Sequence, residues 1–439
     1  MERVRVRVAA LLGVLALSTG TVAGGALWLA AQPAAALTNI AVTSNADPGV
    51  AQACPGSNCT LRQAFATASG TAGDVEIDIP ASVTINLTAG ELPYNGAANL
   101  TVAGNGTTIT QGNSARIIHF TSAQTLTVSG LTLIGGQNCR GGGIDASSGS
   151  VVLTNTTVTQ ATSTCGGGGI WASGSVTATG STVSSNHANS GSGGGIETGS
   201  GSVTLTNSTV TGNTAADGGG GIVGGENQEG FAPVTLTAST IDHNTAGTGD
   251  GGGVEGSSVH ATNSTITNNT VSSSDPGGGI AFRGARVLVY DTITSNSSTD
   301  GANVWLGSDT TLTSVGTVIA LPLGGGTNCT FHVVSQGYNW DDDGSCGFTT
   351  GPGDHSNAGD PLLGVLANNG GPTQTRLPQD GPSPLIDAIP VSACQTGNAA
   401  GVTTDQRGVT RPQGAGCDIG AVEVAVPVAP TTLTAAFTG

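Results

Sequence analysis

The chain has 439 residues, of which 73 are glycine and only 9% are charged, and its formal net charge is −17. Such an acidic surface repels phosphate groups, which excludes nucleic acid as a partner. All 11 basic residues are arginine, so chemistry that needs a lysine base or a lysine Schiff base is also excluded.

The chain begins with the features of an export signal. Several arginines in the first seven residues precede an apolar stretch over residues 8–31, and Ala34-Ala35-Ala36 forms a small-residue cleavage site. These features predict a signal peptide over residues 1–36. An uncleaved anchor is the alternative, because the apolar stretch is long enough to span a bilayer. We expect a secreted or cell-surface protein that meets a membrane only through an uncleaved form of this segment.

Residues 37–74 are expected to cap the repeats that follow them. Within this segment, Leu61 to Ala68 has the apolar spacing of a short amphipathic helix. The first coil of a stacked repeat exposes an unpaired strand edge, which invites aggregation unless something covers it. The sequence therefore predicts an N-terminal capping helix.

A repeat of 26 residues dominates residues 75–325. Each unit contains a glycine cluster that ends in an aliphatic marker, and the spacings of the markers are 26, 26, 26, 32 and 26 residues. The markers are Ile144, Ile170, Ile196, Ile222, Val254 and Ile280. The long spacing contains GGENQEGFAP, which we interpret as a loop insertion. Apolar residues alternate within each unit, which predicts about three short strands per coil. The pattern predicts an all-β, single-stranded parallel β-helix (solenoid) of about ten coils, because a propeller blade needs roughly 40 to 50 residues.

Stacking the repeats places equivalent residues in columns. One inward column comprises Val158, Val183, Val210, Ile241, Ile266 and Ile293. A turn column comprises Asn186, Asn213, Asn244, Asn269 and Asn296. Stacked asparagine amides can hydrogen-bond along the axis of such an assembly.

The cysteine count is even, which in an exported chain suggests four disulfides. Nearest-neighbour pairing would join Cys54 to Cys59, Cys139 to Cys165, Cys329 to Cys346, and Cys394 to Cys417. The second of these pairs is one repeat apart and would staple adjacent coils. Other connectivities remain open at this point, whereas zinc binding lacks the necessary histidine or C-x-x-C spacing.

The coils and their flanks resemble a group of bacterial surface proteins. The repeats look like right-handed parallel β-helix repeats, including those of polymorphic outer-membrane-protein-like chains. CTLRQAFATA at residues 59–68 is similar to the CSLREA motif, with Gln63 and Phe65 departing from it. Residues 359–388 and 405–423 resemble a choice-of-anchor Q domain, which we assign to residues 326–424. The resemblance implies export and a right-handed solenoid, but no agreed activity. We expect the tail at residues 425–439 to be disordered.

The residue after each marker is expected to point outward. This column reads Asp145, Trp171, Glu197, Val223, Glu255 and Ala281. Trp171 and Glu197 are candidate ligand-binding residues, and Asp145, Glu197 and Glu255 are candidate catalytic acids. Two coils separate Asp145 from Glu197, about 9.6 Å by strand spacing, near the upper limit for an inverting glycosidase pair. The alternative is a solvated face that carries scattered acids.

Calcium is the one ion for which the sequence suggests a binding site, and no other cofactor is expected. In NWDDDG, Asn339, Asp341, Asp343 and Gly344 have the offsets of a calcium loop, but position twelve is Thr350. A plain Asx turn is the alternative. Asp217, Asp250 and Asp275 precede successive glycine clusters and could hold a cation, although aspartate is also a common turn residue.

Two further surfaces have weaker signals. Arg283 and Arg286 share one coil and suggest a lyase base, but the register places no acid cluster beside them. An outward threonine column comprises Thr157, Thr182, Thr209, Thr240, Thr265 and Thr292. Flat T-x-T arrays of this kind resemble ice-binding surfaces, although threonine is also simply a good strand residue.

These observations predict an exported, non-enzymatic, monomeric β-helix protein that binds extracellular glycans or other cell-surface components. The alternative is a polysaccharide hydrolase or lyase that acts on acidic or neutral glycans along the helix face. The two functions predict different results. A binding protein only retains the polysaccharide, whereas an enzyme also releases products from it.

Overall fold

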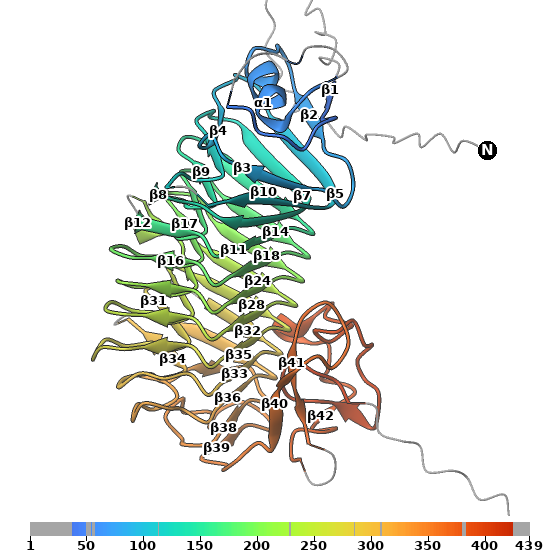
Figure 1. Cartoon of the computed structure of the whole chain (residues 1–439). Helices are drawn as coiled ribbons and strands as arrows, with labels where there is room; N and C mark the ends of the chain where they lie inside the picture. Colours follow the sequence, from blue (N-terminus) through green and yellow to red (C-terminus); the bar gives the residue numbers. More distant parts are fainter. Residues whose placement is uncertain are drawn as a thin grey trace, which may run out of the picture. The chain divides into compact units, whose positions relative to one another are not determined.

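The computed structural model describes residues 37–49, 54, 58–112, 114–227, 230–284, 286–307, 310–379 and 383–424. The predicted signal peptide at residues 1–36, the tail at residues 425–439 and the side chain of Arg286 lie outside this description. Among the described residues, no helix is long and apolar enough to cross a membrane. The described chain is almost entirely β-structure, in coils stacked below one short helix (Figure 1).

Helix α1 (Leu61–Ser69) confirms the predicted capping helix. A capping box closes its first turn, because Thr60 and Gln63 each accept a hydrogen bond from the other's backbone. The side-chain oxygen of Gln63 accepts this bond, as a glutamate oxygen at the same position would. The helix buries Leu61 and Phe65 completely and contacts strands of the first coils, β2 (Val75–Asp78) and β4 (Leu92–Tyr94).

The coils stack into three parallel sheets, and the central coils contribute strands to all three, as the repeat predicts. The nine-stranded sheet takes one strand per coil: β4, β6 (Ile118–Phe120), β9 (Ile144–Ala146), β13 (Ile170–Ala172), β17 (Ile196–Thr198), β21 (Ile222–Val223), β27 (Val254–Gly256), β31 (Ile280–Phe282) and β34 (Val304–Leu306). The six-stranded sheet comprises β8 (Gln137–Arg140), β12 (Thr162–Gly166), β16 (His187–Ala188), β20 (Thr214–Ala215), β26 (Thr245–Ala246) and β30 (Thr270–Val271).

The largest sheet takes two strands from most coils. It begins with β1 (Thr38–Ala41), β2, β3 (Thr84–Leu87), β5 (Leu100–Gln111), β7 (Thr125–Gly135), β10 (Ser150–Thr154), β11 (Thr157–Thr159), β14 (Val176–Thr179), β15 (Thr182–Ser184), β18 (Val203–Thr206) and β19 (Thr209–Thr211). It continues with β24 (Val234–Thr237), β25 (Thr240–Asp242), β28 (Val259–Thr262), β29 (Thr265–Thr267), β32 (Arg286–Val289), β33 (Thr292–Thr294), β35 (Leu312–Val315), β36 (Val318–Ala320), β37 (Val334–Ser335), β38 (Trp340–Asp341) and β39 (His355–Ser356). Parallel pairing thus runs past residue 325 to residue 356. The insertion forms a separate hairpin of β22 (Glu226–Asn227) and β23 (Gly230–Phe231).

The stacking register confirms both predicted inward columns. The glycine-cluster markers pair one above another from Ile144 to Ile280, and the column from Val158 to Ile293 does likewise. All of these side chains are at most 2% exposed. The solenoid core is therefore a stack of aliphatic columns, which hydrophobic burial stabilises.

The glycine clusters are needed because the backbone turns sharply and neighbouring coils approach closely there. Gly193 has a φ of +63°, which a residue with a side chain adopts only with strain. A Cβ on Gly195 would lie 2.7 Å from the carbonyl oxygen of Gly221 on the next coil. The recurring GGGI motif therefore combines a left-handed turn, a close backbone approach and an inward aliphatic residue.

The predicted asparagine column is a continuous hydrogen-bonded ladder. The side-chain amide of each member donates to the amide oxygen of the next, at 2.9 Å from Asn186 to Asn213, from Asn213 to Asn244, and from Asn244 to Asn269. The same oxygens accept the backbone N–H of the preceding coil. All are completely buried, so the ladder satisfies the polar groups of a turn that water does not reach.

Four disulfides join the cysteines in the predicted nearest-neighbour pairs. Cys139–Cys165 connects β8 to β12 and staples adjacent coils. It is the solvent-exposed disulfide among the four, since Cys139 and Cys165 are both exposed and the other pairs are buried or half-buried.

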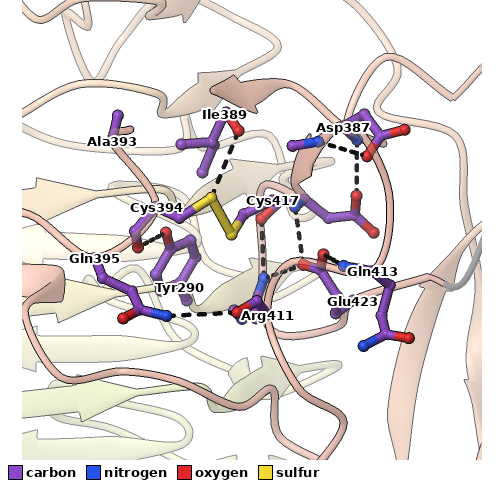
Figure 2. The surroundings of a disulfide bond; sticks show 12 residues. Tyr290, Asp387, Ile389, Ala393, Cys394, Gln395, Arg411, Gln413, Cys417 and Glu423 are labelled. Atoms are coloured by element: carbon purple, nitrogen blue, oxygen red, sulfur yellow. Dashed lines mark hydrogen bonds and ion pairs between the residues drawn. A yellow bond between two sulfur atoms is a disulfide. The ribbon is translucent and has the colours of Figure 1, made fainter. Parts of the chain in front are cut away.

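The C-terminal region folds beside the largest sheet (Figure 1). It contains the antiparallel pairs β40 (Leu363–Ala367) with β41 (Thr375–Pro378) and β42 (Ile389–Pro390) with β43 (Gly416–Cys417), and a 3-10 turn at Gly397–Ala399. Figure 2 shows its centre around Cys394–Cys417. There the buried Arg411 pairs with Glu423 at 2.9 Å and lies over the ring of Tyr290, a solenoid residue.

This region changes the interpretation of the threonine column. Thr240, Thr265 and Thr292 are 1%, 0% and 2% exposed, because Gln374, Gln406 and Ala421 of the C-terminal region bond to them. The prediction that all six threonines face solvent is therefore wrong. Only Thr157, Thr182 and Thr209 remain half-exposed, which removes half of the flat array that an ice-binding surface would need.

Candidate functional site

The outward column of the nine-stranded sheet carries the candidate site. The register pairs its members in the predicted order and extends the column to His119 and Trp305 at its ends. We call the column the outward stripe; it comprises His119, Asp145, Trp171, Glu197, Val223, Glu255, Ala281 and Trp305.

The interpretation of this column as a solvated face is wrong. Asp145 is 4% exposed, and Trp171 and Glu255 are each 9% exposed. The cause lies in the glycine clusters, since from Asp145 to Trp305 a turn glycine four residues before each outward residue lies against it. A Cβ on Gly193, for example, would lie 2.6 Å from Cβ of Glu197. Outward-pointing acids in this stripe are therefore removed from bulk water and depend on protein partners.

Glu197 lies at the centre of the stripe in a hollow of about 290 Å³. Arg140, Trp171, Ser192, Thr198, Gly199, Val223 and Gly225 also line the hollow. The guanidinium of Arg140 lies 4.5 Å from the centre of the Trp171 ring, within range of a cation–π interaction. The hollow thus combines a cation on an aromatic face with a carboxyl group.

The carboxyl group of Glu197 has unusual electrostatics. Its Oε2 atom is buried and has no hydrogen-bond partner among the described residues. Burial raises the pKa of Glu197 to about 7, although the positive charge of Arg140 and the backbone amide of Gly167 lower it. A carboxyl group with this pKa exchanges protons near neutral pH, as general acids and bases do.

The Cys139–Cys165 disulfide places two neighbours of Glu197. Arg140 follows Cys139 directly, and Gly166 follows Cys165. A Cβ on Gly166 would overlap Oε2 of Glu197, so only glycine leaves room for the carboxyl group there. The disulfide between the two coils therefore also positions two residues that lie next to Glu197.

Asp145 belongs to a second group at the N-terminal end of the stripe. It forms an ion pair with Arg116 and accepts a hydrogen bond from Ser147 Oγ at 2.9 Å. Glu91 lies 3.0 Å from Arg116 Nε and 3.0 Å from His119 Nδ1. The structure does not bring Asp145 into the hollow of Glu197, whose lining residues do not include it.

Glu255 lies in a third group, beside a neighbouring hollow of about 330 Å³. Arg283 Nη2 lies 2.7 Å from Asp250 Oδ2, and Nη1 lies 3.9 Å from Glu255 Oε1. The expectation that no acid cluster lies beside Arg283 is therefore wrong. The side chain of Arg283 extends to the preceding coil and contacts acids that do not pair with Arg283 in the strand register.

The three candidate cation ligands before the glycine clusters have protein partners. Burial raises the pKa of Asp250, with Arg283 lowering it and Asp275 raising it. Asp275 Oδ2 accepts hydrogen bonds from Ser273 and from the amide of Gly249, which lower its pKa. Asp217 accepts from Thr248 at 3.3 Å. Arg283 is the cation that the structure places beside Asp250.

The candidate calcium loop folds as a hydrogen-bonded turn. Asp341, Asp342 and Asp343 bring carboxylate oxygens within 4.8 Å of one another, but Asn339 bonds elsewhere, to Ser314 and Asp354. Within the turn, Asn328 and the amide of Cys346 donate to Asp341, and Ser345 donates to Asp343. Burial raises the pKa of Asp341 to about 6. The arrangement satisfies these oxygens with protein donors, as the Asx-turn alternative requires.

The sequence interpretation missed Arg116, His119, Arg140 and Ser147. For His119 a signal existed, because Ile118 lies 26 residues before Ile144 and continues the marker series. Arg140 gives a weaker signal, since it follows a cysteine that is one repeat away from its partner. Arg116 and Ser147 lie outside the repeat consensus, and only the folded coils bring them beside the stripe.

The match to a protein-family model supports the fold. A family model described as "Right handed beta helix region" matches residues 116–314, and the solenoid is a right-handed parallel β-helix. The crystal structure of pectate lyase Pel9A is similar over 88% of this chain and 96% of that chain, with 14% identity and a TM-score of 0.48. No curated protein sequence matches.

Proposed function

We propose that the outward stripe binds polysaccharide chains, with the Glu197 hollow as its central sugar site. The observation that carries this proposal is the buried, unpartnered Oε2 of Glu197 in a hollow of about 290 Å³. A sugar hydroxyl would supply the missing donor, and the Arg140–Trp171 pair would offer a flat face for a sugar ring. Sites along the stripe would then engage successive units of one chain.

Export forms part of the same proposal. The predicted leader at residues 1–36 and the four disulfides suit an oxidising, extracellular setting. The expected partners are extracellular glycans or cell-surface components, bound by a monomer. The resemblance to surface proteins supports an adhesive role without enzymatic activity.

A polysaccharide hydrolase or lyase is the second candidate, which the pKa of Glu197, about 7, favours. Hydrolysis by two carboxyl groups also needs an ionised partner that can activate water. The other carboxyl groups of the stripe serve protein partners instead, since Asp145 pairs with Arg116 and bonds Ser147, and Glu255 lies beside Arg283. Binding without cleavage is therefore the better-supported function.

A panel of insoluble and soluble polysaccharides tests both candidates with the full secreted chain. We expect retention of at least one polysaccharide, weakened about tenfold or more by Glu197→Gln and by Trp171→Ala, because each change removes a contact of about 1–3 kcal/mol. Glu76→Gln, on the largest sheet, is the matched control and should bind normally. Release of reducing or unsaturated ends that Glu197→Gln abolishes would establish the enzyme instead, and retention of nothing would contradict the proposal.

A further inference from the structure

The group at the N-terminal end of the stripe contains residues whose chemistry goes beyond polysaccharide binding. Glu91 lies directly before β4, His119 is the central residue of β6, and Ser147 directly follows β9. These three strands belong to successive coils and pair in register. The coil stacking therefore brings together a serine, a histidine and a glutamate that lie 28 residues apart from one to the next along the chain.

The distances order these residues as nucleophile, base and orienting acid. His119 Nδ1 lies 3.0 Å from Glu91 Oε1, and His119 Nε2 lies 3.5 Å from Ser147 Oγ. An ionised carboxylate only accepts hydrogen bonds, so Nδ1 carries the proton. Nε2 of the neutral ring is then the basic nitrogen, and it faces the serine hydroxyl. This is the arrangement by which a histidine activates a serine for acyl transfer.

The charges around the three residues suit that chemistry. Arg116 contacts both Glu91 and Asp145, and its Nε and Nη1 atoms are buried without an aligned hydrogen bond. This guanidinium can stabilise negative charge that develops on a substrate oxygen. Ser147 donates to Asp145 Oδ1 at 2.9 Å, and Asp145 Oδ2 lies 3.9 Å from His119 Nε2. A small rotation about the Cα–Cβ bond of Ser147 would redirect its proton to His119.

The imidazole of His119 has access to solvent and to a neighbouring cavity. A cavity of about 320 Å³ reaches His119 and is otherwise lined by Ala66, Ser69, Pro93, Tyr94, Asn95 and Thr121. The side chains of His119 and Glu91 are 27% and 29% exposed. A small acyl ester can therefore reach the imidazole from the cavity side.

We propose that Ser147, His119 and Glu91 form an acyl-transfer centre that hydrolyses esters of small carboxylic acids. Ser147 Oγ attacks the ester carbonyl while its proton passes to His119 Nε2. The tetrahedral intermediate collapses, the bond to the alcohol oxygen breaks, and His119 returns the proton to that oxygen. Water then attacks the acyl-serine, His119 accepts a proton from the water, and the carboxylic acid leaves as Oγ regains its hydrogen. Glu91 acts as a positioning residue that holds the ring.

The position of the centre indicates the class of natural ester. Trp171 and Glu197 lie on the next two strands of the same stripe, so a bound polysaccharide would pass Ser147. The natural substrate would then be an O-acylated sugar, an assignment that rests on the proposed polysaccharide binding. The acyl-transfer chemistry itself does not, because a small ester needs only the centre and its cavity.

The chemistry is tested with p-nitrophenyl acetate and with a fluorophosphonate probe that labels activated serines. We expect hydrolysis by the full chain, a loss of about 100-fold or more in Ser147→Ala and His119→Ala, and probe attachment mapped to Ser147 by mass spectrometry. Ser173→Ala is the matched control, because Ser173 takes the same place one coil further on and lacks a histidine. All variants should keep the wild-type melting temperature.

Glu91→Gln separates positioning from simple structural support. We expect kcat to fall by about tenfold or more while KM stays unchanged, since the ring loses its tautomer and orientation. Full activity in Ser147→Ala, or no hydrolysis and no labelling in the wild-type chain, would overturn the proposal. Hydrolysis of p-nitrophenyl acetate without release of acetate from an acetylated polysaccharide would retain the centre and refute only the sugar-ester assignment.

Discussion

At the scale of single residues, the environment of Glu197 decides what the stripe can do. The turn glycine at position 193 covers its Cβ and Gly166 lies against its carboxyl group, so little water reaches the charge. Arg140 offsets only part of that loss, because its guanidinium is also engaged with Trp171. The result is a carboxyl group that is partly protonated at neutral pH.

Replacement of Glu197 by glutamine tests this state through stability. The folded-state pKa of about 7 lies above the ordinary value of 4.5, so the folded chain binds the proton more tightly than the unfolded chain. This contribution is fully present at acidic pH and is lost as the pH rises from about 4.5 through 7. Urea unfolding should show the wild type losing on the order of 3 kcal/mol more than Glu197→Gln between pH 4.5 and pH 8. Glu76→Gln should follow the wild type, and equal pH dependence in all three chains would show that Glu197 is solvated.

At the scale of elements, the asparagine ladder stabilises each turn through the next coil. Asn244 accepts the backbone N–H of Asn213 and donates to the carbonyl of Val210 and to the amide oxygen of Asn269. One side chain thus satisfies groups on both neighbouring coils. Because all of these groups are buried, the loss of one member affects its neighbours on both sides.

Asn244→Ala should therefore destabilise the solenoid strongly. It leaves the Asn213 amide and the Val210 carbonyl without this partner in the core, and we expect a loss of about 3–5 kcal/mol. Asn189→Ala, at an exposed position of the same repeat, should change stability by less than about 0.5 kcal/mol. Denaturant midpoints measure both variants. Similar midpoints for the two would mean that solvent, and not the ladder, satisfies the turn.

At the scale of the whole described chain, polar contacts bind the C-terminal region to the solenoid, in addition to a shared hydrophobic cluster that includes Tyr290, Val318, Leu385 and Ile389. Gln406 is 1% exposed and donates to Thr240 and Thr373 while accepting from Thr265. Arg376 donates to Thr294 and Ser295 on the same face. In the sequence these threonines look like a repetitive solvent-exposed surface. In the structure their hydroxyl groups form the surface on which the C-terminal region docks.

Gln406→Ala should loosen this docking without unfolding the coils. The change leaves several buried hydroxyl and carbonyl groups without a partner, so we expect a loss of about 2–3 kcal/mol and faster protease cleavage within residues 360–424. Gln413→Ala serves as the control, because that side chain is exposed and bonds only to Thr410 among the described residues. Cleavage at the wild-type rate would show that other contacts are sufficient to keep the C-terminal region docked on the solenoid. The contacts around Arg411 and Glu423 in Figure 2 are an example.

The sequence determined the solenoid, because stacking in register turns a one-dimensional period into columns. The 26-residue spacing of Ile144, Ile170 and Ile196 was sufficient to predict the inward markers and the asparagine ladder, and it placed Cys139 and Cys165 one coil apart. It also identified the outward stripe. Each of these features repeats with the coil, so local pattern and tertiary position agree.

Only the tertiary structure decided which outward residues are buried, charged or paired. Turn glycines cover Glu197, a non-repeating Arg116 reaches Asp145, and a distant segment covers Thr265. The turn glycines repeat with the coil, whereas Arg116 and the segment over Thr265 do not follow the period. The repeat therefore predicts the framework, whereas the electrostatics of the candidate site depend on burial and charge pairing that arise only when the coils stack.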